Sequence, residues 1–147
     1  MAKRVILLCI SIVVIGSVIG MFCYTNTPEY IMKKYVKAVN SKDQKSLERI
    51  IYTANQLKVV DINEAYESGR AYNIQEYRFQ GELDDPDPTT MIPLLLRYKY
   101  PEKMTDSIDR LQTFTIYGDD NNWDYDIKIG RVNGRWQVVW TPLTVYE

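Results

Sequence analysis

The sequence predicts an α+β protein in which an N-terminal transmembrane helix precedes two or three helices packed on a curved antiparallel sheet. The uncharged run Val5 to Tyr24 indicates the transmembrane helix. Apolar residues then recur at helical spacing as far as Tyr66, and from about Asn73 they alternate with polar residues, as in strands. Helices that precede such a sheet in the chain are expected to cover one of its faces.

The uncharged run matches the ~20 apolar residues that cross a ~30 Å hydrocarbon core. Lys3 and Arg4 stand directly before it, and cations on this side hold the N-terminus in the cytoplasm. We therefore expect residues 1–24 to form a cytoplasmic tip and a transmembrane anchor. Residues 25–147 are expected to form one extracytoplasmic domain, because a chain of this length builds a single core. The expected location is the cell membrane, crossed once.

A cleaved signal peptide is the alternative to an anchor, because it also has a cationic start and an apolar run. The apolar part of a signal peptide is shorter, and the available cleavage sites end at Gly20 or Thr25. Neither site has the small residues of the A-x-A pattern. Lipoprotein processing at Cys23 would follow Met21 and Phe22, where small residues are expected. The length of the run and the poor cleavage sites favour the anchor.

The first helix of the domain is predicted to begin at Pro28. Thr27 is a suitable N-cap, Pro28 suits the first helical position, and Glu29 faces the positive end of the helix. Asn40 and Ser41 are expected to end this helix. Its apolar stripe comprises Ile31, Met32, Tyr35, Ala38 and Val39.

Two further helices are predicted after a short link. The segment Asp43 to Ala54 has an amphipathic pattern, and the short link favours an antiparallel arrangement with the first helix. Asp61 and Glu64 resemble a capping box, and Gly69 can supply the left-handed residue that stops a short third helix. The apolar positions of the two helices are Leu47, Ile50, Ile51 and Ala54, followed by Ile62, Ala65 and Tyr66.

Strands are predicted in the second half of the chain. One lies around Tyr77 and another over Leu96–Tyr100, with an acidic, proline-containing loop at 84–88 between them. The segment 111–117 is predicted to pair with 123–129, and two registers fit this pairing equally well.

Asn133 and Gly134 predict a two-residue type I′ hairpin turn, because both tolerate a positive φ. This turn sets the register of the strands on either side. The expected pairs, which share one face of the sheet, are Arg131 with Trp136, Ile129 with Val138, and Ile127 with Trp140.

The two ends of the domain carry distinctive patterns. The first is T-P-E-Y at 27–30, followed by Tyr35, Ala38, Val39, Asn40, Asp43 and Leu47; the second is V-N-G-R-W at 132–136, followed by Val138, Trp140 and Pro142. Together they resemble the nuclear transport factor 2-like superfamily, and especially the non-catalytic N-terminal domain of methicillin-resistance-type penicillin-binding proteins. Between Lys58 and Thr105 only the order of elements agrees. The resemblance implies a cone-shaped domain without transpeptidase activity, because the transpeptidase domain has no counterpart in these residues.

The resemblance also implies a pocket between the sheet and the helices. Aromatic residues could line this pocket, although packing in the core would explain them equally well. The residues expected at the pocket by their pattern are Tyr35, Tyr66, Tyr77, Trp123, Tyr125 and Trp140.

Composition argues against several functional classes. The chain has no histidine, which excludes histidine-dependent catalytic triads and removes the commonest metal ligand. Without Lys3 and Arg4, 16 Lys and Arg remain after residue 24 against 19 Asp and Glu, a net charge of −3. No basic stripe is left for nucleic acid. Both cysteines, Cys9 and Cys23, lie in the apolar run.

The acidic run at 119–126 offers oxygen ligands, but it fails the EF-hand pattern. Tyr125 stands at the glycine position and Arg131 at the position of the closing glutamate. We therefore expect a solvated turn and no bound metal. An isomerase-like enzyme on the same fold would need a buried acid beside a tyrosine. No acid stands alone on an apolar stripe, so we expect neither catalysis nor a cofactor.

Gly16 and Gly20 form a GxxxG pair, whose spacing lets two membrane helices approach closely. The expected partners are the membrane, a protein of the cell envelope and a second copy of the chain. The predicted function is that of a small membrane-anchored protein with a non-catalytic extracytoplasmic binding or assembly domain. The alternatives are a secreted ligand-binding protein, released by signal cleavage, and the isomerase-like enzyme.

Overall fold

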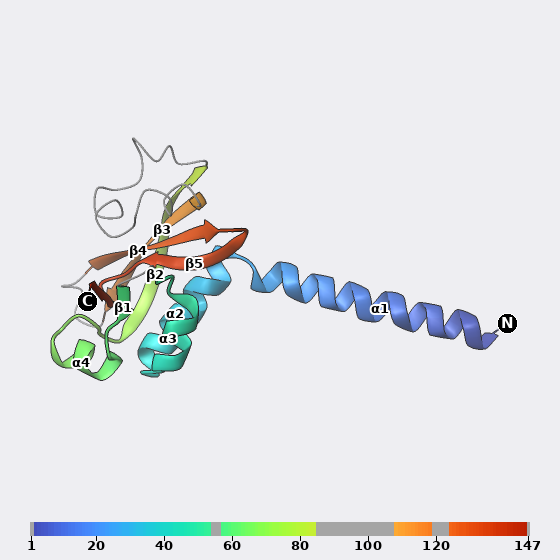
Figure 1. The fold of residues 1–147 in the computed structure, drawn as a ribbon, viewed down its shortest axis with the longest axis horizontal. Helices are drawn as coiled ribbons and strands as arrows, with labels where there is room; N and C mark the ends of the chain where they lie inside the picture. Colours follow the sequence, from blue (N-terminus) through green and yellow to red (C-terminus); the bar gives the residue numbers. More distant parts are fainter. Residues whose placement is uncertain (1, 54–56, 85–107, 119–123, 147) are drawn as a thin grey trace.

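The structure, a computed structural model, describes residues 2–53, 57–84, 108–118 and 124–146. Helix α1 (Ala2–Thr25) extends away from a domain of shorter helices and antiparallel strands (Figure 1). This arrangement confirms the predicted α+β class. The side chains of α1 are described for residues 10–18, 20–21 and 24–25. Among the residues that the structure describes, no helix is both long enough and apolar enough to cross a membrane.

Helix α2 (Pro28–Asn40) begins and ends as the sequence predicts. Thr27 has an extended backbone, and its hydroxyl oxygen accepts a hydrogen bond from the Tyr30 N–H at 3.2 Å. Proline occupies the first helical position, where no backbone donor is needed. The predicted apolar stripe is confirmed, because its members are all buried: Ile31, Met32, Tyr35, Ala38 and Val39.

Helix α3 (Gln44–Ile50) begins where predicted but is shorter. Its predicted continuation to Ala54 is wrong, because Ile51 has an extended backbone and forms an isolated parallel bridge with Val138. The Tyr52 N–H then donates to the Val138 carbonyl oxygen at 2.8 Å. The backbone after Ile50 thus forms hydrogen bonds with the edge strand of the sheet, and the helix does not continue.

The predicted third helix is α4 (Ile62–Glu67). The Asp61 carboxylate accepts hydrogen bonds from the backbone N–H groups of Asn63 and Glu64, at 2.9 and 3.2 Å. Gly69 follows the helix with a φ of 71°, in the left-handed region that glycine adopts without strain. The short helix, its cap at Asp61 and its left-handed stop at Gly69 are therefore confirmed.

Within the described residues, four strands form an antiparallel sheet in the order β2-β3-β4-β5, and β1 pairs with β6 in a separate two-stranded sheet (Figure 1). The sequence predicted neither β1 nor β6, and the predicted strand at Leu96–Tyr100 lies outside the described residues. The strands are β1 (Leu57–Val59), β2 (Ile74–Asp84), β3 (Ile108–Gly118), β4 (Asp124–Val132), β5 (Arg135–Trp140) and β6 (Thr144–Tyr146).

The predicted pairing of β3 with β4 is confirmed, in the register that sets Phe114 opposite Ile127. The hairpin turn between β4 and β5 is confirmed as well, because Asn133 and Gly134 both have positive φ angles, 50° and 77°. Two of the three predicted pairs across this hairpin are present, namely Arg131 with Trp136 and Ile129 with Val138.

A β-bulge changes the far end of this hairpin. The predicted pairing of Ile127 with Trp140 is wrong, because Lys128 faces Trp140 instead. Val139 is the extra residue and is buried. It packs against Gly130, where an added Cβ would lie 2.9 Å from a Val139 methyl carbon. The bulge therefore turns Trp140 to the opposite face of the sheet.

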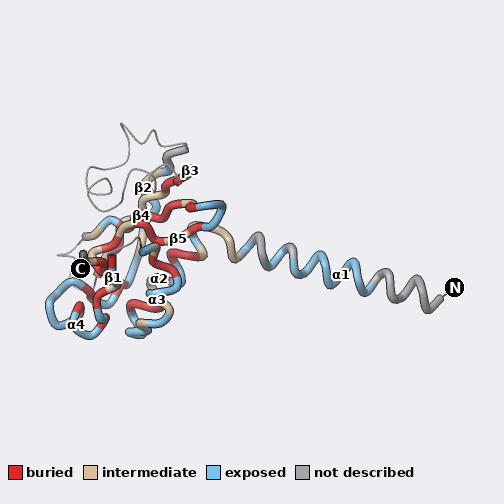
Figure 2. Tube along the Cα trace, viewed as in Figure 1, coloured by how far each residue is buried: buried red, intermediate tan, exposed pale blue. Residues whose placement is uncertain are grey.

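Buried residues are concentrated in the sheet and on the inward sides of α2 and α3, whereas the described part of α1 is exposed (Figure 2). The main cluster lies between the helices and one face of the sheet. Because side chains alternate along each strand, a smaller cluster forms on the opposite face. This second cluster comprises Leu57, Ile108, Leu111, Val132 and Val139, with Tyr52 and Trp140 packed against it.

Candidate functional site

The junction between α1 and the domain is fixed by side-chain contacts. The Asn26 side chain donates to the Gly134 carbonyl oxygen at 3.2 Å and accepts from the Trp136 N–H at 3.4 Å. The rings of Tyr24 and Tyr30 meet edge to face, with centroids 5.5 Å apart. The end of α1 is thus attached both to α2 and to the β4–β5 turn.

A groove of about 440 Å³ lies beside this junction, between α2 and α3. Most of its lining side chains are polar or basic, and the buried residues Ala38 and Ile50 also contribute. The lining residues are Tyr24, Tyr30, Lys33, Lys34, Lys37, Ala38, Ser41, Asp43, Ser46, Arg49 and Ile50.

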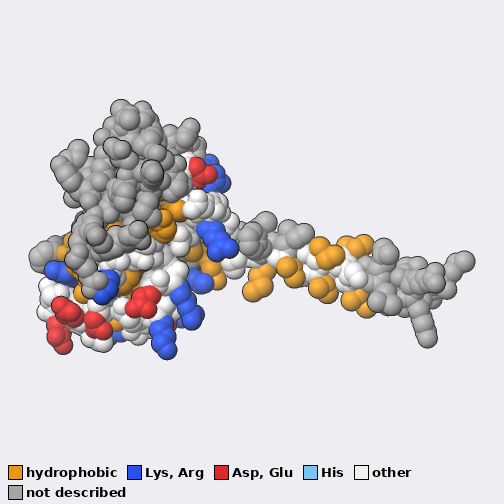
Figure 3. Space-filling view, viewed as in Figure 1, with side chains coloured by type: hydrophobic (Ala, Val, Ile, Leu, Met, Phe, Trp, Pro, Cys, Tyr) orange, Lys and Arg blue, Asp and Glu red, His pale blue; other side chains and the backbone are white. Residues whose placement is uncertain are grey.

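The lining of the groove carries an excess of positive charge. Its four cations, Lys33, Lys34, Lys37 and Arg49, face one carboxylate, that of Asp43, which leaves a net charge of +3. Basic side chains also gather on the visible part of the domain nearest α1 (Figure 3). This charge contrasts with the net negative charge of the domain as a whole.

Few of these cations are neutralised by neighbours. Lys33 forms an ion pair with Glu29 at 3.0 Å, and both side chains are more than half exposed. The Lys34 ammonium lies 4.8 Å from the centroid of the Tyr30 ring, a contact that leaves its charge intact. Lys37 has no ion-pair partner among the described residues.

The carboxylate in the groove already has hydrogen-bond donors. Asp43 accepts from the Ser46 N–H at 3.1 Å and from the Ser46 hydroxyl at 2.7 Å. These hydrogen bonds, aided by the charge of Arg49, hold the pKa of Asp43 below its usual range. Asp43 therefore stays ionised as the cap of α3, and lysine ammonium and arginine guanidinium groups remain to bind an anion.

Of the residues predicted to line an aromatic pocket, Tyr35 borders a very small space. The main core contains Tyr35, and Tyr66, Tyr77 and Tyr125 pack against it, whereas Trp140 belongs to the cluster on the opposite face. Trp123 lies outside the described residues. The space beside Tyr35 measures about 10 Å³, no more than one water molecule needs. Ligand binding there stays a prediction.

Two tyrosine hydroxyls in this region have hydrogen-bond partners. Tyr35 lies 2.7 Å from the Thr141 hydroxyl, and burial raises the pKa of Tyr35. The Tyr66 hydroxyl donates to the Val39 carbonyl oxygen at 3.1 Å. Tyr125 stacks on Tyr72 with centroids 5.7 Å apart. These contacts are typical of core packing.

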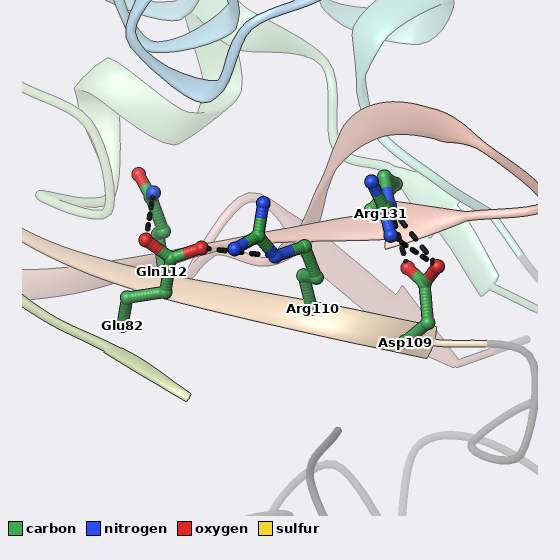
Figure 4. A network of polar contacts seen from close by, with 5 residues as sticks. All are labelled: Glu82, Asp109, Arg110, Gln112 and Arg131. Carbon is green, nitrogen blue, oxygen red and sulfur yellow. Dashed lines mark hydrogen bonds and ion pairs between the residues drawn. The ribbon is translucent and has the colours of Figure 1, made fainter. Parts of the chain in front are cut away.

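A polar network ties neighbouring strands together on the sheet (Figure 4). Arg131 donates to both carboxylate oxygens of Asp109, with distances from 2.6 to 3.0 Å. Arg110 lies 3.3 Å from Glu82, which also accepts from Gln112 at 2.9 Å. Each charged side chain in this network has a partner of opposite charge, which indicates a structural role.

Replacing Asp109 by asparagine is expected to lower the free energy of unfolding by less than about 1 kcal/mol near neutral pH, because the pair is partly exposed. Hydrogen bonds from Arg131 hold the pKa of Asp109 below its usual range. This contribution is therefore present above about pH 4 and is lost as the pH falls through the lowered pKa. Urea unfolding of both chains should give curves that converge in acid, and a constant difference at every pH would contradict this.

The other predicted positions give simpler results. Gly16 and Gly20 are exposed on α1, and an added Cβ at either would meet no atom within 4 Å. Their role in self-association stays a prediction.

No group of metal-ligating side chains occurs among the described residues. The groove was not predicted from the sequence. Lys33, Lys34 and Lys37 lie off the apolar stripe of α2, but Arg49 comes from the neighbouring helix, so the groove depends on how the two helices pack.

The described residues define an α+β domain in which helices cover one face of an antiparallel sheet, preceded by helix α1. Comparisons with protein-family models, curated proteins and solved structures find no match to this chain. The resemblance to the nuclear transport factor 2-like superfamily therefore stays a prediction.

Proposed function

We propose that this chain is a single-pass membrane protein whose α1 anchors a non-catalytic binding or assembly domain at the outer face of the cell membrane. The observation that carries the proposal is the uncharged run Val5 to Tyr24, which lies within one continuous helix. Large apolar side chains along α1 are exposed, and an exposed apolar surface of this extent marks a site of contact with a membrane or another protein. They include Ile10, Ile12, Val13, Val14, Ile15, Val18 and Met21.

The length of the uncharged run also supports the proposal. At ~1.5 Å per residue, the whole run would measure about 30 Å, the thickness of a hydrocarbon core. Lys3 and Arg4 favour a cytoplasmic N-terminus, which places the domain on the other side of the membrane.

The interior of the domain supports binding without catalysis. Its main core is closed around Tyr35, and the larger hollow lies on the outside, between α2 and α3. We propose the nuclear transport factor 2-like cone as the finer description of the fold. Helices precede an antiparallel sheet whose register shifts near Gly81 and at Val139, and such bulges bend a sheet.

Whether the mature protein retains α1 distinguishes a membrane anchor from a cleaved signal peptide. The full chain would be expressed in cells, the membranes washed with alkaline carbonate, and the retained protein sequenced from its N-terminus. The proposal expects protein in the pellet that still contains residues 5–24. A chain that begins after Gly20 or Thr25, or one released by carbonate, would favour the secreted ligand-binding protein instead.

A further inference from the structure

The groove between α2 and α3 begins at the end of α1. Tyr24, in the last turn of that helix, forms part of its lining. If α1 spans the bilayer as proposed above, Tyr24 lies at the interface between hydrocarbon and headgroups, where tyrosine is enriched. The mouth of the groove then opens at the depth of the lipid headgroups.

A chain of contacts leads from this interface to the basic side chains. The Tyr24 and Tyr30 ring centroids are 5.5 Å apart, and the Lys34 ammonium lies 4.8 Å from the Tyr30 centroid. These two distances place the Lys34 ammonium at most about 10 Å from the Tyr24 ring. The Debye length is about 8 Å at physiological ionic strength, so the charge of Lys34 is partly screened but still reaches the membrane surface.

The basic groups converge on the same hollow from two helices. Lys34 and Lys37 extend from α2 and Arg49 extends from α3, and all three line the groove. The two hydrogen bonds of the Asn26 side chain connect the junction to the β4–β5 turn, which limits rotation of the domain about the end of α1. The groove is therefore presented to the bilayer in a defined orientation.

We propose that this groove binds the phosphate headgroup of an anionic lipid in the outer leaflet. Ammonium and guanidinium groups form charge-assisted hydrogen bonds with phosphate oxygens, and a net positive lining favours a lipid that carries a negative charge over a zwitterionic one. The tyrosine rings would lie against the glycerol region. This inference rests on the proposed anchoring by α1.

The test uses the full chain in neutral detergent, titrated with phosphatidylglycerol or with phosphatidylcholine, and native mass spectrometry measures the lipid retained. The groove variant is Lys34→Gln, Lys37→Gln and Arg49→Gln. We expect it to bind phosphatidylglycerol at least about tenfold more weakly than the natural chain, because each removed cation contributes roughly fivefold at a membrane surface. The natural chain should prefer phosphatidylglycerol to phosphatidylcholine.

A matched control removes the same charge elsewhere, through Lys45→Gln, Lys58→Gln and Arg70→Gln, all at exposed positions outside the groove. It should retain phosphatidylglycerol as the natural chain does. Equal losses in both variants, or equal retention of the two lipids, would overturn the proposal. Unchanged circular dichroism spectra would show that each variant is folded.

Two competitors identify the source of the phosphate. Glycerol 3-phosphate that displaces the lipid at equal concentration would assign the groove to a soluble phosphate, and polyglutamate that binds in place of the lipid would assign it to an acidic protein. Either result overturns the proposal. Because lipid retention is measured in detergent, it can fail in a chain that carbonate extraction shows to be anchored, and the two hypotheses are therefore separable.

Discussion

Replacing Tyr35 by alanine is expected to lower the free energy of unfolding by about 3–5 kcal/mol, as for other large aromatic residues removed from a core. Tyr35 is only 1% exposed and lies on the inward stripe of α2, packed among the residues that join the helices to the sheet. Its removal would leave a cavity at the centre of the main cluster. Urea unfolding of the detergent-solubilised full chain measures the loss.

Tyr35→Phe is the matched control, because it keeps the ring and removes only the hydroxyl that contacts Thr141. The expected loss is about 0.5–1.5 kcal/mol, since the Thr141 oxygen still accepts from the Leu143 N–H. Burial raises the pKa of Tyr35, so its hydroxyl stabilises the fold below about pH 10 and loses that effect at higher pH. Equal effects of alanine and phenylalanine would show that the ring does not fill the core.

Replacing Ile12 and Ile15 together by arginine is expected to move most of the protein out of the membrane. Both residues lie near the middle of the uncharged run and are exposed on α1. Each arginine at the centre of a spanning helix raises the free energy of membrane insertion by about 2.5–3.5 kcal/mol on insertion scales. The two arginines together offset most of the favourable insertion free energy of the apolar residues. The fraction of protein resistant to carbonate extraction measures the change.

Ala2→Arg is the corresponding control, because it adds a cation outside the uncharged run on the side already occupied by Lys3 and Arg4. It should remain in the membrane like the natural chain. If the double arginine variant stayed in the carbonate pellet to the same extent as the natural chain, α1 could not be in contact with hydrocarbon.

Helix starts were predictable from the sequence because their causes are local. Thr27 and Asp61 cap helices whose N–H groups lie two or three residues away. The hairpin turn was predictable for the same reason, since Asn133 and Gly134 determine its geometry by themselves. The early end of α3 was not, because Ile51 leaves the helix to bridge a strand that lies far along the chain.

The bulge at Val139 could not be predicted from alternation. Val138, Val139 and Trp140 are all apolar, so their pattern fits either register, and both faces of the sheet are packed at this end. The candidate groove depends on how two helices lie beside one another. Three of its cations could be located on one side of α2, but the position of Arg49 depends on tertiary packing.

The central claim is that α1 crosses the membrane and holds the domain outside, and cysteine labelling in intact cells tests it most directly. Both native cysteines, Cys9 and Cys23, would be replaced by serine, and single cysteines introduced as Glu67→Cys or Ala2→Cys. Glu67 is exposed at the end of α4. A membrane-impermeant maleimide should label the Glu67→Cys chain in intact cells and the Ala2→Cys chain only after lysis. Labelling of the Glu67→Cys chain only after lysis would contradict the account.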